Sequence, residues 1–366
     1  MQTNSLKTLA IVVSIFFFTS NLSGSFLTVY YKELGLGIPG IITILLFTFP
    51  LIGLLPLFLL RSVKNFERIM SFGIFFTMLF YVVLIFIRTP IILGLAYGLS
   101  IATFWPSFNL LQFRLGESKV RARTVSLFSS IIPALTSIVG PGVGGFVIES
   151  FGFEALFITA VALYIIAFFL SLRIRFQPET HKFSFPRNRA FLIFFITFIL
   201  LGLSEAYWLV YPLFVLGISG TVLNMGVVLA LSAVLISAAT FMVNWLSDIK
   251  KTRVHFAVIG AMLNAAWFFM LAFASTTYQI VGLSLLSGLA SAFNISWFAH
   301  YGDSFSKEHH ASILTLMEVG LMIGRIANLA PTYVFIATAD YASYFRLSGV
   351  FLLFIIPLYV VSERGR

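Results

Sequence analysis

The chain alternates between long apolar runs and short clusters of charged residues. Each run holds about 20 residues, the length that an α-helix needs to cross the hydrocarbon core of a bilayer. Cutting the chain at its charge clusters predicts twelve such helices and therefore an all-α membrane protein. The expected ranges are 7–30, 38–60, 69–87, 90–112, 124–148, 153–172, 190–213, 220–246, 254–274, 277–300, 311–334 and 342–361.

The composition supports a membrane environment. Hydrophobic residues make up 60% of the 366 residues and charged residues only 10%, and the mean hydropathy is +1.02. No water-soluble core could bury this much apolar surface. The chain has no cysteine, which excludes disulfides and thiolate metal sites. The net charge of +10 comes from short clusters between the spans rather than from one basic face, so no nucleic-acid partner is expected.

The basic residues indicate the orientation in the membrane. Most of the 23 lysines and arginines fall at the two termini and in alternate connections. Such residues remain on the cytoplasmic side, so a multi-pass protein of the cell membrane (plasma or inner) with both termini in the cytoplasm is predicted. The longest connection, "RIRFQPETHKFSFPRNR", divides the chain into a six-helix bundle at 1–172, a cytoplasmic linker at 173–189 and a second six-helix bundle at 190–366.

The two halves resemble each other. "LTVYYKELGLGIPGI" at the end of the first span aligns with "LVYPLFVLGISGTV" at the end of the seventh. "FNLLQFRLGES" in the fourth span aligns with "FNISWFAHYGDS" in the tenth if one residue is inserted. The similar spacing of both matches indicates an internal duplication and two pseudo-symmetric bundles.

A glycine-rich motif in the fifth span carries a family resemblance. In "IVGPGVGGFVIESFGFEALF", Gly140, Pro141, Gly144 and Gly145 fit the G-P-x-x-G-G signature of the major facilitator superfamily of secondary transporters, which the whole chain resembles. The resemblance implies twelve helices in two bundles that work by alternating access. In that family the signature is commonest among drug and metabolite exporters that exchange substrate for protons. The alternative is that these glycines serve close helix packing alone.

A second family signature, G-x-L-x-D-R-x-G-R-R, is degraded here. After the eighth span "NWLSDIKKTR" keeps Asp248 and Arg253 but loses both glycines, and after the second span Ser62 takes the aspartate position. The resemblance implies that Asp248 and Arg253 help to close the cytoplasmic side. The alternative is ordinary positive-inside topology. The family's arginine in the fourth span has no counterpart in "GLSIATFWPSFNLLQ", which argues against the family's usual proton route.

Three ionisable residues lie well inside the predicted spans: Glu205, Glu318 and Arg325. A charge at the bilayer centre costs at least ~2.5 kcal/mol, so each should face protein or a water-filled cavity. Glu205 and Arg325 lie at matching depth, and Glu318 lies two turns before Arg325 on the same helix face. We hypothesise that Arg325 binds one of the two carboxylates and releases it in another state, which couples transport to protons. A permanent structural ion pair is the equally weighted alternative.

The resemblance also suggests which residues contact the substrate. In the family, helices 1, 4, 7 and 10 line the central cavity, and amide groups beside aromatic faces suit an amphipathic or aromatic molecule. For each candidate, an interhelical hydrogen bond or an interfacial aromatic anchor is the alternative. The candidates are Asn21, Trp105, Asn109, Tyr207, Trp208, Asn294 and Trp297.

The function predicted from these patterns is secondary active transport of a small molecule by a monomer, as proton-coupled efflux. Uptake by proton symport and a transport-inactive receptor or scaffold are the alternatives. An enzyme is not expected, because all five histidines fall in loops or at span ends and no phosphate-binding G-x-x-x-x-G-K occurs. No cofactor or metal is expected, and the predicted partners are the substrate, protons and the lipid bilayer.

Overall fold

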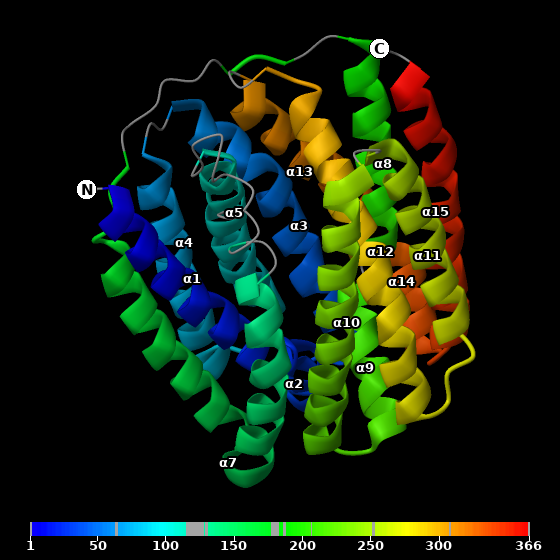
Figure 1. Cartoon of the computed structure of the whole chain (residues 1–366). Helices are drawn as coiled ribbons and strands as arrows, with labels where there is room; N and C mark the ends of the chain where they lie inside the picture. The colour runs from blue at the N-terminus through cyan, green and yellow to red at the C-terminus, as the bar shows by residue number, and fades with distance from the viewer. Residues whose placement is uncertain are drawn as a thin grey trace. The chain divides into compact units, whose positions relative to one another are not determined.

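The computed structural model describes residues 2–62, 65–114, 128, 131–176, 183–185, 188–205, 207–250, 253–306 and 309–364. Throughout these ranges the regular structure is helical, with no strand (Figure 1). In chain order the helices are α1 (Gln2–Gly24), α2 (Leu27–Glu33), α3 (Gly37–Ser62), α4 (Phe66–Phe86), α5 (Pro90–Arg114), α7 (Ile132–Ser171), α8 (Arg189–Glu205), α9 (Tyr207–Ser219), α10 (Val222–Lys250), α11 (Arg253–Leu271), α12 (Thr277–Asp303), α13 (His310–Ala327), α14 (Leu329–Ala337) and α15 (Tyr341–Arg364).

The observed helices follow the predicted spans closely, and the predicted all-α membrane fold is confirmed. Nine stretches of described helix are long and apolar enough to cross a membrane. Three of them consist of two consecutive helices: α1 with α2, α8 with α9, and α13 with α14. The residues 124–127 and 129–130, predicted to begin the fifth span, lie outside the described residues.

The stretch named α7 contains two of the predicted spans. Its backbone turns at Gly152, where φ is 82° and ψ is 172°. A side chain would strain this conformation, so glycine allows the chain to reverse here without an irregular loop. The turn falls in the predicted gap between 148 and 153, and Figure 1 shows the two arms of α7 on either side of it.

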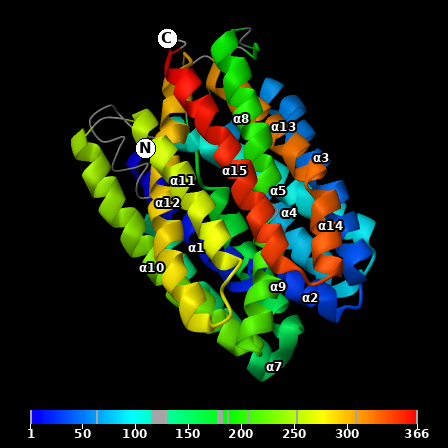
Figure 2. The same ribbon diagram turned by 90° about the vertical axis from the view of Figure 1, so that its right-hand side faces the viewer.

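The chain forms two compact units. Unit 1 contains Met1–Phe183 together with Val222–Ala230, and unit 2 contains Ser184–Thr221 together with Leu231–Arg366. In unit 1, α1 packs on α7, and α5 packs on both α3 and α4. In unit 2, α8 packs on α13 and α15, and α11 packs on α12 and α15 (Figure 2). The predicted bundle boundaries at 172/173 and 189/190 stay a prediction.

Glycines set the separation of the helices in unit 1. A Cβ atom added to Gly144 would clash with the carbonyl oxygen of Leu22, and one added to Gly140 would lie 2.7 Å from the Cβ of Asn21. The backbones of α1 and α7 are therefore in direct contact. Gly73 of α4 makes a similar contact with α5, because its added Cβ would lie 2.5 Å from the backbone nitrogen of Phe104. In lipid such contacts supply packing energy that the hydrophobic effect does not.

The first prediction tests this packing with two glycines of one helix. Gly144→Ala should cost about 2 kcal/mol, because overpacking a tight contact forces the backbones apart. Gly142→Ala is the matched control, since its added methyl would lie 3.7 Å from the Cβ of Ala230, an ordinary contact. Thermal unfolding of the purified protein in detergent should show a lower apparent Tm for Gly144→Ala alone. Equal melting temperatures for the two variants would contradict the assigned contact.

Candidate functional site

Arg325 of α13 lies between two carboxylates in unit 2. Its Nη2 atom is 2.5 Å from Glu205 Oε2, and its Nε atom donates to the same oxygen at 2.7 Å. Its Nη1 atom donates to Glu318 Oε2 at 3.4 Å. The structure therefore brings together the three ionisable residues that sequence analysis placed inside the spans. The guanidinium is shared unequally, with the shorter contacts going to Glu205.

The burial of the three side chains is also unequal. The exposed fraction is 14% for Arg325, 10% for Glu318 and 34% for Glu205. All three lie within helical stretches that are apolar enough to span a membrane, Arg189–Ser219 and His310–Ala337. Each charge needs a partner there, because desolvating a single ion costs several kcal/mol. Glu205 is the member of the set most open to its surroundings.

A glycine contact between α8 and α13 positions the ion pair. A Cβ atom on Gly202 would clash with the carbonyl oxygen of Leu321, and one on Gly324 would clash with that of Ile199. The two backbones thus touch immediately beside the charges: Glu205 follows Gly202 by three residues, and Arg325 directly follows Gly324. This helix contact was not predicted from the sequence. Its signal was the small-xxx-small spacing of "GLMIG", residues 320–324.

The polar face of α13 continues past Arg325. Thr315, Asn328 and Thr332 are all buried, and the Nδ2 atom of Asn328 donates to the hydroxyl of Tyr344 at 3.2 Å. α13 ends before Asn328 and α14 begins after it. Pro331 lacks an N–H group and cannot donate to the carbonyl four residues earlier, which accounts for the interruption. A broken helix beside buried charges is a recurrent feature of ion and substrate sites in membrane transporters.

Unit 1 contains a cavity of about 160 Å³ between α1, α4, α5 and α7, and the described residues that line it are uncharged. Its wall is mostly aromatic. Phe16 stacks on Phe104 with ring centroids 3.6 Å apart, and Tyr81 stacks on Tyr164 at 5.6 Å. The Tyr81 hydroxyl also accepts a hydrogen bond of 2.6 Å from Ser23. The lining residues are Phe16, Ser20, Gly24, Leu27, Thr77, Phe80, Tyr81, Tyr97, Ser100, Ile101, Phe104, Trp105 and Tyr164.

Of the predicted substrate contacts whose side chains the structure describes, only Trp105 lines this cavity. The Asn21 amide donates to the Thr136 hydroxyl of α7 at 3.2 Å. Tyr207 meets Trp267 edge-on, with centroids 5.7 Å apart. Trp297 is buried, and its ring centroid lies 3.9 Å from that of Tyr359. The Asn21 contact has the form of the interhelical hydrogen bond given as the alternative. A substrate role for all three residues stays a prediction.

The remaining predicted residues are distributed over both units. Asn109 in α5 and Trp208 in α9 are half-buried. The backbones of Asp248, Arg253 and Asn294 belong to α10, α11 and α12, and their side chains lie outside the described residues. The motif residues Gly140, Pro141, Gly144 and Gly145 are all buried in α7. A Cβ on Gly145 would lie 3.0 Å from the carbonyl oxygen of Val222, so this glycine too makes a close helix contact.

Comparison with known proteins places the fold. No family model matches the chain. The crystal structure of the nucleoside transporter NupG, in a mutant form, superposes with a TM-score of 0.69 over 97% of this chain and 99% of that chain, at 16% sequence identity. The likeness shows that the chain shares the fold of this structure, in line with the all-α membrane fold expected from the sequence.

Two curated proteins match parts of the chain. The uncharacterized protein YqgE of Bacillus subtilis is 27% identical over 184 residues, which are 45% of this chain and 41% of that protein. The methylenomycin A resistance protein of Streptomyces coelicolor is 39% identical over 72 residues, which are 19% of this chain and 15% of that protein. Both matches thus span less than half the length of these relatives.

The ion cluster gives a second prediction, on stability. Arg325→Gln leaves Glu205 and Glu318 without a cation, and breaking a buried pair in this way costs roughly 3 kcal/mol. Replacing both carboxylates as well, in the triple variant Glu205→Gln, Glu318→Gln and Arg325→Gln, should restore most of the lost stability. Thermal unfolding in detergent measures both effects. Arg346→Gln, which removes an exposed arginine of α15, is the control. A triple variant as unstable as Arg325→Gln would exclude unpaired charge as the cause.

Proposed function

We propose that this protein is a secondary active transporter that moves a small molecule across the cell membrane by alternating access. The observation that carries the proposal is the buried ion cluster of Arg325, Glu205 and Glu318, inside a fold shared with a transporter over nearly its full length. Charges inside apolar spans are costly and commonly mark ion or substrate pathways.

The cluster suits proton coupling because two carboxylates compete for one guanidinium. Arg325 keeps its charge under ordinary conditions, so the set can alternate only through its carboxylates. When Glu205 takes up a proton, its attraction for Arg325 falls and the guanidinium can move fully to Glu318, now 3.4 Å away. If substrate binding changes which carboxylate Arg325 contacts, proton movement is linked to transport.

The competing proposal is a permanent ion pair that holds α8 to α13. The glycine contacts beside the charges support it, because they fix the two helices at a separation that suits the 2.5 Å contact. Exchange assays distinguish the two roles. A coupling residue is needed for gradient-driven accumulation but not for exchange of substrate across a loaded vesicle, whereas a structural residue is needed for both.

The third prediction applies this distinction in proteoliposomes. Glu205→Gln should abolish accumulation driven by a pH gradient while substrate exchange continues. Glu318→Gln should have the same effect if the guanidinium alternates between the carboxylates. Glu149→Gln, the same change at an exposed glutamate of α7, is the control that should retain both activities. Unchanged gradient-driven flux in Glu205→Gln would rule this residue out of the coupling site.

For the direction of transport we propose proton-coupled efflux, as in the drug and metabolite antiporter branch of the superfamily. The glycine motif of α7 and the local match to a resistance protein support it. Uptake by proton symport is the second candidate, favoured by the shared fold with a nucleoside transporter. Flux under inward and outward pH gradients separates the two. We further propose that the protein works as a monomer, that Asp248 and Arg253 contribute to the cytoplasmic gate, and that both termini are cytoplasmic.

The aromatic cavity of unit 1 suggests the class of substrate. Its described lining residues carry no charge, and the Tyr81 hydroxyl accepts a hydrogen bond from Ser23. Ligand pockets commonly reach about 300 Å³ or more, so a cavity of about 160 Å³ suits one ring system rather than a whole drug-sized molecule. We infer that the substrate carries an uncharged aromatic ring that stacks in this cavity.

The fourth prediction concerns Trp105, which lines the cavity. For a transported aromatic substrate, Trp105→Leu should raise KM about five- to tenfold, the loss expected for one aromatic stacking contact. Phe58→Leu is the control, because Phe58 is 72% exposed on α3 and does not line the cavity. A panel of aromatic and non-aromatic solutes, screened in proteoliposomes, provides the substrate. Preferential transport of solutes without a ring would overturn the assignment.

A further inference from the structure

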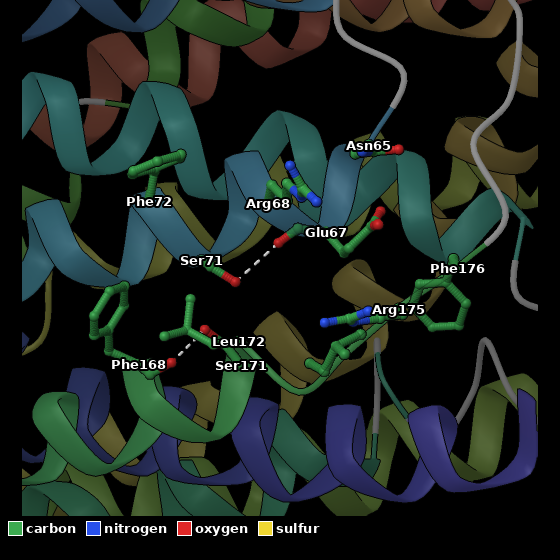
Figure 3. Close-up of a pocket in the computed structure, with 11 residues that line it drawn as sticks. Asn65, Glu67, Arg68, Ser71, Phe72, Phe168, Ser171, Leu172, Arg175 and Phe176 are labelled. Atoms are coloured by element: carbon green, nitrogen blue, oxygen red, sulfur yellow. Dashed lines mark hydrogen bonds between the residues drawn. The ribbon is translucent and has the colours of Figure 1, made fainter. Parts of the chain in front are cut away.

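A second pocket, of about 330 Å³, lies in unit 1 between the start of α4 and the end of α7. Figure 3 shows the first turns of α4 along one side and the last turn of α7 along the other, with the Arg175 side chain between them. The lining residues are Asn65, Glu67, Arg68, Ser71, Phe72, Phe168, Ser171, Leu172, Ile174, Arg175 and Phe176. None of them belongs to the ion cluster or to the aromatic cavity.

The segment that carries Arg175 is held in place. The buried side chain of Ile174 precedes it, and the carbonyl oxygen of Arg175 accepts a hydrogen bond of 3.1 Å from Ser5 in α1. Arg68 is fixed by the helix to which it belongs, α4. Both arginine side chains are exposed, and neither forms an ion pair with a carboxylate of the described residues. Two exposed guanidiniums on ordered backbone are thus available to a ligand.

The charge in the pocket defines the ligand further. Glu67 lines the same pocket and is buried. Two guanidiniums and this carboxylate leave one net positive charge, which a phosphodiester balances. A guanidinium matches phosphate oxygens geometrically. The carboxylate of Glu67 can in addition accept hydrogen bonds from hydroxyl groups next to the phosphate.

The position of the pocket favours a lipid over a dissolved phosphate. Phe66–Phe86 and Ile132–Ser171 are both long and apolar enough to span a membrane, and the pocket lies where the first begins and the second ends. It therefore lies at the level of the lipid headgroups. Two of its lining residues are exposed apolar side chains, Phe72 at 56% and Leu172 at 53%. Exposed apolar groups beside arginines match a headgroup with its acyl chains.

We propose that this pocket binds an anionic phospholipid whose phosphodiester pairs with Arg68 and Arg175 and whose acyl chains lie against Phe72 and Leu172. A headgroup with free hydroxyl groups, such as that of phosphatidylglycerol, also supplies donors for Glu67. The bound lipid joins the start of α4 to the end of α7, so it stabilises unit 1.

The fifth prediction is tested with the full-length protein in detergent by titrating phosphatidylglycerol, phosphatidylcholine, phosphatidylethanolamine or inorganic phosphate. Native mass spectrometry counts retained lipid, and thermal unfolding measures stabilisation. Phosphatidylglycerol should raise the apparent Tm and remain bound. Arg68→Gln with Arg175→Gln should weaken its binding about fivefold for each arginine. The matched control is Arg61→Gln with Arg173→Gln, which removes two exposed arginines that do not line the pocket.

Each contrary result overturns the proposal in a different way. Equal loss of phosphatidylglycerol in both double variants would reduce the effect to overall charge. Inorganic phosphate that raises the Tm as strongly as the lipid would indicate a site for a free anion. Preference for phosphatidylcholine or phosphatidylethanolamine would exclude an anionic headgroup. If the double variant does not fold, Arg175→Gln is compared with Arg173→Gln. The two arginines lie in one short segment, but only Arg175 lines the pocket.

Discussion

Direct contact between helix backbones at glycine is the interaction on which each unit of this protein depends. In lipid, an apolar side chain gains little by leaving the bilayer for a neighbouring helix, so helices associate through van der Waals contact and hydrogen bonds. Gly144 brings α7 onto α1, and Gly202 with Gly324 brings α8 onto α13. A side chain at any of these positions would enter the backbone of the partner helix. The glycines therefore set the separation of the helices, and this separation determines the distances between the side chains of the proposed sites.

The glycine contacts also determine the geometry of the ion cluster. Arg325 directly follows a contact glycine, and Glu205 lies one turn after another. A shift of α13 along α8 would open the glycine contact and lengthen the ion pair together. The packing and the charges therefore favour the same arrangement of the two helices. In unit 1 the equivalent contact, Gly73 against Phe104, brings together helices whose facing side chains form an uncharged aromatic cavity. One packing principle thus supports two chemically different environments.

Features that depend on position along a helix, such as span limits and residue depth, could be predicted from the sequence. Contacts that depend on which helix faces pack together could not. Span limits and the matching depth of Glu205 and Arg325 follow from counting residues, and the structure agrees. Counting does not reveal that Gly320 and Gly324 make α13 fit α8, because small residues are common in membrane helices. The same limit applies to Trp297, which was predicted at a cavity and packs on Tyr359. Its depth could be predicted, but its neighbours could not.

The unequal sharing of Arg325 bears on how the proposed coupling would operate. Glu205 receives two short contacts and is 34% exposed, whereas Glu318 receives one contact of 3.4 Å and is 10% exposed. The carboxylate that binds the guanidinium more tightly is thus also the more exposed of the two. Its neutralisation would release Arg325 toward a partner that is already within reach on the same helix. The exchange then needs a change of rotamer in one long side chain and leaves the glycine contact between α8 and α13 closed. Proton binding would thus first change the side-chain contacts of Arg325 inside unit 2, before any larger movement. The guanidinium would remain paired with a carboxylate throughout, as the low dielectric of the site requires.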